Sequence, residues 1–232
     1  MSCAYYHKVG HYMIESWLKH WDKSFNLIVY SEDIIPSEHP RIEFRDLRMF
    51  NPDLHQFITA THSNSRSPIF AKKAWPIMHH LLPSRGYLVW IDADVITENT
   101  IRPSWISRLV GNHFSAHLGV PQQGYYSVET GFFVINRTNS YKDLFLSKYK
   151  TIYLTRDFSN MYKPFDGDTF GRVIRECKEM PGFSYKELAP KPDKVLSPFN
   201  KVFKNRMWHL KGKHKEKDLT QSPRVAKAIK TS

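Results

Sequence analysis

Two aspartates, Asp92 and Asp94, directly follow the apolar run YLVWI (Tyr87–Ile91) and are separated by one alanine. Such a run is typical of a buried strand, and open α/β sheets bind ligands at the carboxyl ends of their strands. Two carboxylates that converge there repel each other unless a cation lies between them. Mg²⁺ and Mn²⁺ prefer oxygen ligands and accept a bridging diphosphate. The spacing therefore indicates a metal–diphosphate site, and the alternative is a pair of turn-forming aspartates.

The segment VWIDADVI resembles the Asp-x-Asp motif of nucleotide-sugar-dependent glycosyltransferases with the GT-A fold. The resemblance extends, with differing strength, over most of the chain. It implies an α/β fold with a Rossmann-like, open and mostly parallel sheet flanked by helices. It also implies a nucleoside-diphosphate sugar as the donor substrate.

A second motif, His-x-x-Gly-x-x-Lys, is formed by His209, Gly212 and Lys215. It resembles the pattern of the retaining, glycogenin-like and galactosyltransferase branch. The resemblance implies that His209 is the third metal ligand beside Asp92 and Asp94, and that Gly212 and Lys215 hold the diphosphate. An imidazole favours Mn²⁺ over Mg²⁺, glycine lets the backbone approach a phosphate, and lysine neutralises the departing charge. The alternative for His209 is a surface histidine in a basic tail.

Two further donor contacts follow from the resemblance. Tyr6 occupies the place where such enzymes hold the nucleotide base, on which its ring would stack. The segment Phe70–Lys73 resembles the basic helix segment before the motif strand, where one cation contacts the donor. We expect Lys73 to be the basic residue that contacts the donor, and Lys72 is the alternative.

Three carboxylates are the catalytic candidates. Glu129 begins a segment, Glu-Thr-Gly, that resembles the family's Asn/Asp-Ser-Gly between donor sugar and acceptor but departs from it in two residues. Asp166 and Asp168 resemble the acidic helix start that contacts the hydroxyls of the donor sugar, and a carboxylate that accepts two hydroxyl bonds discriminates sugars well. The alternative for this pair is helix capping.

Helices and strands alternate through the first half of the chain, which favours a mostly parallel, open α/β sheet. Pro76 is expected to bend its helix or to lie near its start. We expect helices at Val9–Trp21, Ile69–Leu82, Pro103–Val110, Tyr141–Tyr149 and Asp166–Cys177, and strands at Phe25–Tyr30, Arg41–Leu47, Tyr87–Ile91, Thr130–Ile135 and within Val202–Leu210.

The chain is expected to form one glycosyltransferase domain over residues 1–215, followed by a basic tail over 216–232. A fold of this kind normally begins with a strand, yet the first helix follows almost directly after Met1. Either that strand is very short or further residues precede it.

The formal charge is +12, and residues 201–232 hold ten Lys and Arg against two acids. Such an excess favours polyanionic partners. The two cysteines exclude a disulfide framework and a thiolate metal cluster. Because no signal peptide and no run near the ~18 apolar residues of a membrane helix is present, we expect a cytoplasmic protein of bacterial or viral origin, in the host cytoplasm if viral.

These observations favour a metal-dependent glycosyltransferase that moves a hexose or pentose with retention. The charge suggests an anionic acceptor, such as modified bases of phage DNA, although a lipopolysaccharide or other glycan precursor fits equally. A hypothesis of another class is a non-catalytic basic nucleic-acid-binding protein, with the aromatic residues of Lys201–Trp208 as its stacking platform. A third is a metal-dependent phosphotransferase or nucleotidyltransferase.

Overall fold

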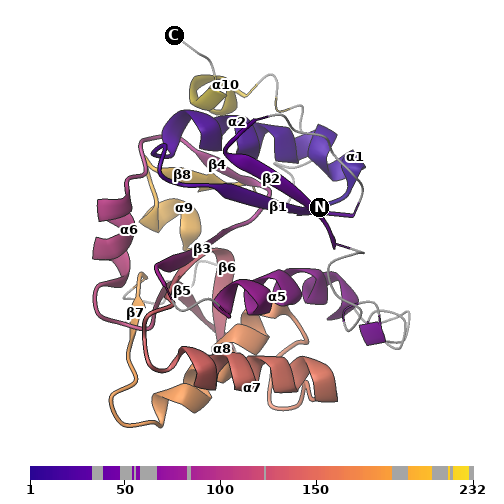
Figure 1. Ribbon diagram of the computed structural model, residues 1–232, viewed down its shortest axis with the longest axis vertical. Helices are drawn as coiled ribbons and strands as arrows, with labels where there is room; N and C mark the ends of the chain where they lie inside the picture. Colours follow the sequence, from indigo (N-terminus) through magenta and orange to yellow (C-terminus); the bar gives the residue numbers. More distant parts are fainter. Residues whose placement is uncertain are drawn as a thin grey trace. The chain divides into compact units, whose positions relative to one another are not determined.

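The computed structural model describes residues 1–32, 39–47, 54, 56–57, 67–82, 85–122, 124–189, 198–210, 219 and 222–229. The chain divides into two compact units, each built from segments that are far apart in the sequence (Figure 1). The first unit comprises Met1–Phe50, Ile91–Ser107 and Phe199–Ser232, and the second comprises Asn51–Trp90 and Arg108–Pro198.

The first unit contains two small sheets. Strands β1 (Leu27–Ser31) and β2 (Ile42–Asp46) pair in parallel, with Leu27 opposite Ile42. Strands β4 (Val95–Thr97) and β8 (Met207–His209) pair antiparallel, although more than a hundred residues separate them. Its helical elements are α1 (Cys3–Tyr5), a π-helical turn η1 (Tyr6–Gly10), α2 (His11–His20), α9 (Phe199–Val202) and α10 (Pro223–Ile229).

The apolar core of the first unit contains residues from both the N-terminal and the C-terminal part of the chain. Tyr12 of α2, Ile96 of β4 and Val225 of α10 are buried in one apolar cluster. His20 at the end of α2 bonds through Nε2 to the carbonyl of Ala228, 3.0 Å away. Figure 1 shows α10 beside α2, so residues 223–229, expected within a basic tail, form a helix that packs on the first unit.

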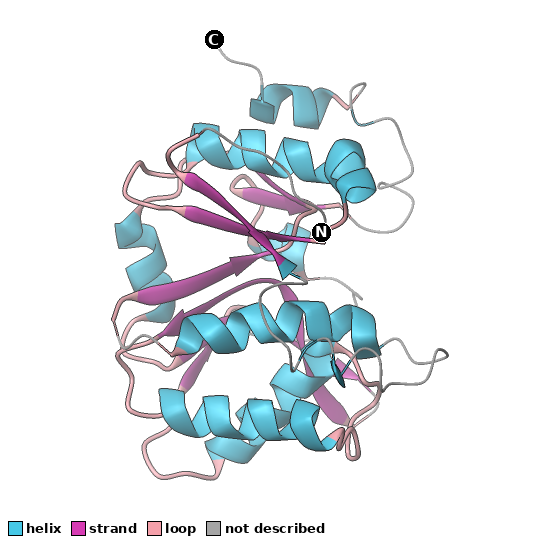
Figure 2. Ribbon diagram, turned by 45° about the vertical axis from the view of Figure 1, so that its right-hand side comes forward, coloured by secondary structure: helices cyan, strands magenta, loops and turns pink. Residues whose placement is uncertain are grey.

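The second unit is built on a four-stranded sheet of order β3-β6-β5-β7. Its strands are β3 (Tyr87–Ile91, whose last residue belongs to the first unit), β5 (Ser115–Gln122), β6 (Tyr125–Asn136) and β7 (Tyr185–Glu187). Its helices are α5 (Ser67–Leu81), α7 (Lys142–Thr155) and α8 (Asp166–Lys178), while α6 (Pro103–Val110) begins in the first unit and ends in the second. Figure 2 shows these helices in cyan alongside the magenta strands.

Aromatic rings fill the interior of the second unit. Phe114, Phe133, Phe145 and Phe170 are fully buried, and the ring of Phe170 contacts those of Phe133 and Phe145 at centroid distances of 4.9 and 5.1 Å. Large rings remove much apolar surface from water, so burial of this cluster stabilises the unit. The high aromatic content of the sequence is thus used largely in the core.

The prediction of one mostly parallel sheet is wrong, because the described sheets are small and mixed. Strand β5 pairs antiparallel with β6 and parallel with β7. Only two residues separate β5 from β6, and such a short connection joins antiparallel neighbours, whereas a parallel pair requires a long crossover. Strand β5 was not predicted, because Gly119 and Pro121 interrupt its apolar pattern.

Most predicted elements are confirmed with shifted ends. The bounds of β3 and α6 agree with the predictions Tyr87–Ile91 and Pro103–Val110. Pro76 lies inside α5 rather than near its start. The expected last strand is confined to Met207–His209, and Val202 ends a short helix instead.

Within the described part of the chain, no helix has the length and apolar character needed to cross a membrane.

Candidate metal centre

The turn between β3 and β4 carries the two aspartates of the first motif. Strand β3 ends at Ile91, and the N–H of Val95, the first residue of β4, donates to the carbonyl of Asp92 at 3.0 Å. The chain therefore turns over Asp92 and Asp94, as expected where a strand ends. Asp94 is buried, with 4% of its surface exposed, and Asp92 is partly buried.

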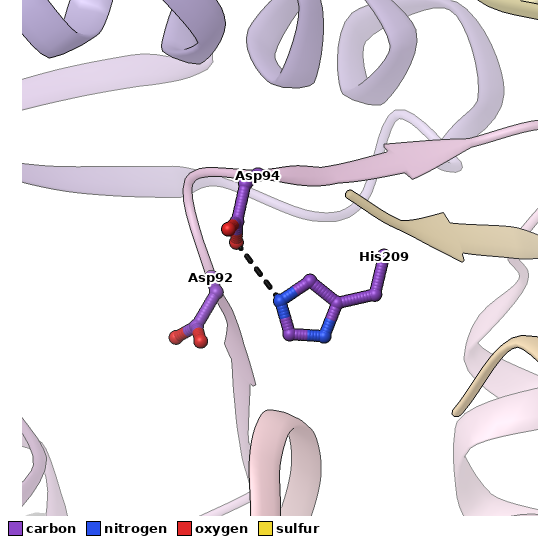
Figure 3. A group of neighbouring side chains, drawn as sticks. All are labelled: Asp92, Asp94 and His209. Carbon is purple, nitrogen blue, oxygen red and sulfur yellow. Dashed lines mark hydrogen bonds and ion pairs between the residues drawn. The ribbon is translucent and has the colours of Figure 1, made fainter. Parts of the chain in front are cut away.

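Strand pairing places His209 beside this turn. His209 is opposite Val95 in the β4–β8 ladder, and the N–H of Leu210 donates to the carbonyl of Asp94 at 2.9 Å. These backbone bonds fix the start of β4 against the end of β8. The side chain of His209 consequently lies next to that of Asp94 (Figure 3).

Two residues of α9, Asn200 and Phe199, also contact His209. The side-chain amide of Asn200 donates to the carbonyl of His209 at 3.2 Å and accepts from its N–H at 2.8 Å. The ring of Phe199 meets the imidazole edge-on, with centroids 5.1 Å apart. The backbone and the ring of His209 are thus both fixed, which lowers the entropic cost of ordering this side chain when a metal ion binds.

The donor atoms of Asp92, Asp94 and His209 converge. One ligand atom from each residue lies within 4.8 Å of the others, and Nε2 of His209 is 3.0 Å from Oδ1 of Asp94. Two carboxylates and an imidazole are a donor set that suits Mn²⁺, Mg²⁺ or a similar divalent cation. The residues therefore fit a metal ion, as the sequence predicted for this trio, and the donor set leaves the choice of metal open.

Tyr5 also contacts this group. Its hydroxyl donates to Oδ2 of Asp94 at 3.3 Å. The neighbouring Tyr6, which was expected to stack on a nucleotide base, packs edge-on against the rings of His7, His11 and Phe44. Tyr6 is partly buried in this aromatic group, and its role toward a base stays a prediction.

A second set of predicted residues comes together in the second unit. The ammonium group of Lys73 lies 3.0 Å from Oδ2 of Asp166 and donates to the carbonyl of Thr130 at 2.6 Å. The hydroxyl of Thr130 donates to the same carboxylate oxygen at 2.5 Å. The side chains of Lys73 and Asp166 are both nearly buried. Because little water reaches them, each charge is compensated mainly by the other.

Asp168 lies two residues after Asp166, in the first turn of α8. It is buried, its Oδ1 has no hydrogen-bond partner among the described residues, and no ion pair of Asp168 is observed there. Burial raises the pKa of Asp168, and hydrogen bonds from the hydroxyl of Ser127 and the backbone of Lys163 oppose that shift. A buried carboxylate oxygen with spare acceptor capacity can receive a ligand hydroxyl.

Glu129 lies where strand β6 is irregular. Leu118 of β5 is opposite Glu129, whereas Ala116 is opposite Val134, so residues 130–133 form a bulge opposite His117. Bulges commonly redirect side chains next to functional sites. Glu129 accepts from the N–H of Gly131 at 3.3 Å and is partly buried.

The structure thus groups the predicted site residues unevenly. Asp92, Asp94 and His209 meet in the first unit, and Lys73 and Asp166 meet in the second. Gly212 and Lys215 lie outside the described residues. Tyr5 and Asn200 were missed, because a lone tyrosine and a lone asparagine carry no spacing signal and their roles depend on contacts distant in the sequence.

Comparisons with known proteins give a structural match without a match in sequence. No protein-family model matches the chain, and no curated protein matches its sequence. Among solved structures, the WbbM bifunctional glycosyltransferase in its apo form matches with a TM-score of 0.57 and 15% identity. The match covers 91% of this chain but 45% of that chain, so the chain spans less than half of its length. The chain therefore has a glycosyltransferase-like α/β fold.

Proposed function

We propose that the protein is a metal-dependent glycosyltransferase that moves a sugar from a nucleoside-diphosphate sugar to an acceptor. The observation that carries the proposal is the convergence of Asp92, Asp94 and His209 within a glycosyltransferase-like fold. An Asp-x-Asp pair alone occurs often by chance. Its meeting with a histidine 115 residues farther along the chain, on a fold that resembles a known glycosyltransferase, is far more specific.

In this proposal Asp92, Asp94 and His209 bind the cation, and Gly212 and Lys215 contact the diphosphate. The bound cation would act as a Lewis acid toward the departing diphosphate. Asn200 and the β4–β8 ladder hold His209 in place, so ordering the His209 side chain on metal binding would cost little free energy.

Asp166, Asp168 and Glu129 are proposed to act on the donor sugar and the acceptor. The buried Oδ1 of Asp168 supports a hydrogen bond from a sugar hydroxyl. Lys73 was expected to contact the donor, but its ammonium group is paired with Asp166. A direct contact between Lys73 and a phosphate would require that ion pair to rearrange, so its support of Asp166 is the role favoured by the geometry.

We further propose transfer with retention, which rests on the His-x-x-Gly-x-x-Lys resemblance. The bond between the anomeric carbon and the diphosphate oxygen breaks as the acceptor oxygen attacks on the same face. The proton of the acceptor hydroxyl passes to the departing phosphate oxygen, so no separate base is needed. The acceptor itself is proposed to be anionic on the basis of the +12 formal charge.

Hydrolysis of sugar nucleotides without acceptor tests the proposal. UDP-, GDP- and dTDP-sugars are incubated with the protein and Mn²⁺, and the released nucleotide is identified. We expect slow release of nucleoside diphosphate from one donor, and Asp94→Asn should lower the rate at least about 100-fold, because a metal contributes several kcal/mol to such a step.

The matched control is Glu15→Gln, which removes an exposed carboxylate from α2 of the same unit and should leave the rate unchanged. Release of monophosphate or pyrophosphate would instead indicate nucleotidyl transfer. No turnover of any donor, or full activity of Asp94→Asn, would contradict the proposal.

A further inference from the structure

A lysine that contacts two aromatic rings lies just before helix α8 in the second unit. The ammonium nitrogen of Lys163 is 4.8 Å from the ring centroid of Tyr162 and 5.6 Å from that of Phe165. Lys163 is exposed to solvent, and Tyr162 and Phe165 are partly buried. Among the described residues, no carboxylate forms an ion pair with this ammonium group, in contrast to those of Lys73 and Lys148. The charge of Lys163 is therefore accessible to an anion from solution.

The backbone that carries Lys163 is fixed by a tight turn. The N–H of Phe165 donates to the carbonyl of Lys163 at 2.8 Å across Pro164, whose restricted φ suits a three-residue turn of this kind. The ring of Phe165 also packs on that of Phe70 in α5, with centroids 4.6 Å apart. An anion would thus meet a cation whose backbone and aromatic contacts are already ordered, which lowers the entropic cost of binding.

Lys163 lies beside a carboxylate that the proposed function assigns to sugar binding. Burial raises the pKa of Asp168, whereas a hydrogen bond from the backbone of Lys163 and the positive charge of its side chain lower it. Oδ1 of Asp168 is buried and has no hydrogen-bond partner among the described residues. A hydrogen-bond acceptor for a hydroxyl group and a cation for an anionic group therefore lie next to each other at the start of α8.

This combination of groups fits an acidic sugar better than a nucleic acid. A sugar with a carboxylate or a phosphate carries hydroxyl donors and one anionic group on the same small ring. DNA instead carries a phosphate at every nucleotide, and the carboxylate of Asp168 would repel the phosphates next to the one that Lys163 binds. The two aromatic rings also exclude water from part of the ammonium group, which strengthens its attraction to an anion.

We propose that Lys163 binds the anionic group, a carboxylate or a phosphate, of an acidic sugar that lies next to Asp168. Its assignment to a sugar rests on the proposed function. The acidic sugar belongs to the acceptor or is the sugar of the donor, and both sources present the same chemistry. Lys163 thus adds a specific contact to the overall positive charge of the chain, at a residue for which the sequence motifs gave no signal.

Binding of three small probes to the full-length protein tests this role in the absence of a donor. Methyl glucoside is neutral, methyl glucuronide carries a carboxylate, and glucose 6-phosphate carries a phosphate on the same kind of ring. Dissociation constants are measured by ligand-observed NMR for the wild type, Lys163→Gln and Lys163→Arg. Lys150→Gln is the matched control, because Lys150 is an exposed lysine of α7 in the same unit. Circular dichroism and thermal melting establish that each variant is folded.

We expect the wild type to bind an acidic probe about fivefold more tightly than methyl glucoside, as expected of an ion pair near the surface. Lys163→Gln should remove this preference, whereas Lys163→Arg and Lys150→Gln should keep it. Added salt, about 0.5 M NaCl, should weaken it. Equal affinities of the wild type for the three probes, or a preference that persists in Lys163→Gln, would overturn the proposal. Binding of a single-stranded oligonucleotide that depends on Lys163, without a preference among the probes, would overturn it in favour of a nucleic-acid contact.

Sugar nucleotides then distinguish the two sources of the acidic sugar. If it belongs to the donor, the wild type should hydrolyse UDP-glucuronic acid with a lower KM than UDP-glucose, and Lys163→Gln should remove the difference. If it belongs to the acceptor, the two KM values should agree while the preference among the probes remains. A wild type that prefers the acidic probes but releases nucleoside diphosphate from no donor would contradict the transferase assignment and support the anion contact of Lys163.

Discussion

At the scale of single residues, the second unit buries charge at the pair of Lys73 and Asp166. Each side chain is about nine-tenths buried, and Thr130 supplies a hydroxyl donor and a carbonyl acceptor to the pair. A buried ion pair adds little to stability in itself, but removal of one partner leaves an uncompensated charge. Replacement of one residue of the pair should therefore lower the free energy of unfolding strongly, whereas replacement of both by apolar residues should lower it much less.

Replacement Lys73→Met tests this sensitivity. We expect the free energy of unfolding to fall by about 3 kcal/mol, because the carboxylate of Asp166 loses its counter-ion in a nearly buried site. Urea denaturation followed by tryptophan fluorescence measures the change. In the double variant Lys73→Met, Asp166→Leu much of the loss should be recovered, and a loss below about 1 kcal/mol in the single variant would argue against strong coupling.

The same scale shows what sequence can predict of the site. Asp92 and Asp94 could be predicted because their signal is local: two carboxylates directly after an apolar strand. His209 was predicted through a motif resemblance, and the β4–β8 register explains why it reaches them. Tyr5 and Asn200 could not be predicted, because their contacts follow from the packing of α1 and α9, which local spacing does not encode.

At the scale of elements, helix α8 lies unusually close to strand β6. A Cβ atom on Gly167 would come within 2.3 Å of the carbonyl oxygen of Val128, and one on Gly171 within 2.2 Å of that of Tyr126. The two glycines, one helical turn apart, let the helix rest directly on the strand backbone. This close approach positions the first turn of α8, which carries Asp166 and Asp168.

Gly171→Ala should therefore destabilise the protein by roughly 1–3 kcal/mol, because the added methyl group meets rigid backbone. Thermal or urea unfolding measures the effect. Gly10→Ala provides a contrast, since its methyl group would meet the flexible end of Met1 and alanine is the better helix former. Equal effects of the two substitutions would contradict the close packing of α8 on β6.

Elements were also predicted more reliably than their pairing. An apolar run such as Tyr87–Ile91 identifies a strand from its own residues. The direction and neighbours of a strand depend on connections, and β5 carries Gly119 and Pro121, which concealed it. The four-residue bulge of β6 opposite His117 has no sequence signature, although it shapes the segment that contains Glu129 and Thr130.

At the scale of the whole molecule, a buried histidine predicts how stability depends on pH. His117 is fully buried, with Nδ1 3.1 Å from the hydroxyl of Ser115 and Nε2 3.0 Å from that of Tyr126. Tyr126 donates its one proton to Glu187 at 2.6 Å, so it must accept from Nε2–H, and Nδ1 accepts from Ser115. Burial lowers the pKa of His117 to about 3.

Stability should consequently fall on acidification. Between the unfolded-state pKa of 6.5 and the folded-state pKa of about 3, the unfolded chain binds a proton at His117 that the folded chain does not. The free energy of unfolding should fall by about 1.4 kcal/mol per pH unit from this residue within that window. Urea unfolding of the wild type and His117→Gln between pH 6 and pH 4 compares the slopes, and equal slopes would refute this origin.

The division into two units is a further property of the whole molecule that the sequence did not reveal. Each unit combines segments that are distant in the sequence, so no linker composition marks a boundary. The predicted domain of residues 1–215 and the tail of 216–232 stay predictions, although α10 within 216–232 is packed on the first unit. Burial of Val225 and Ala228 is a tertiary effect that a count of basic residues cannot anticipate.

The central claim, that Asp92, Asp94 and His209 bind one cation together, is tested most directly by isothermal titration of the intact protein with Mn²⁺. We expect one ion per chain, and Asp92→Asn, Asp94→Asn and His209→Ala should each weaken binding by more than about 100-fold, beyond the usual cost of losing an outer partner. Glu15→Gln should bind as the wild type does. Absence of Mn²⁺ binding by the wild type, or wild-type affinity in the three variants, would contradict the account.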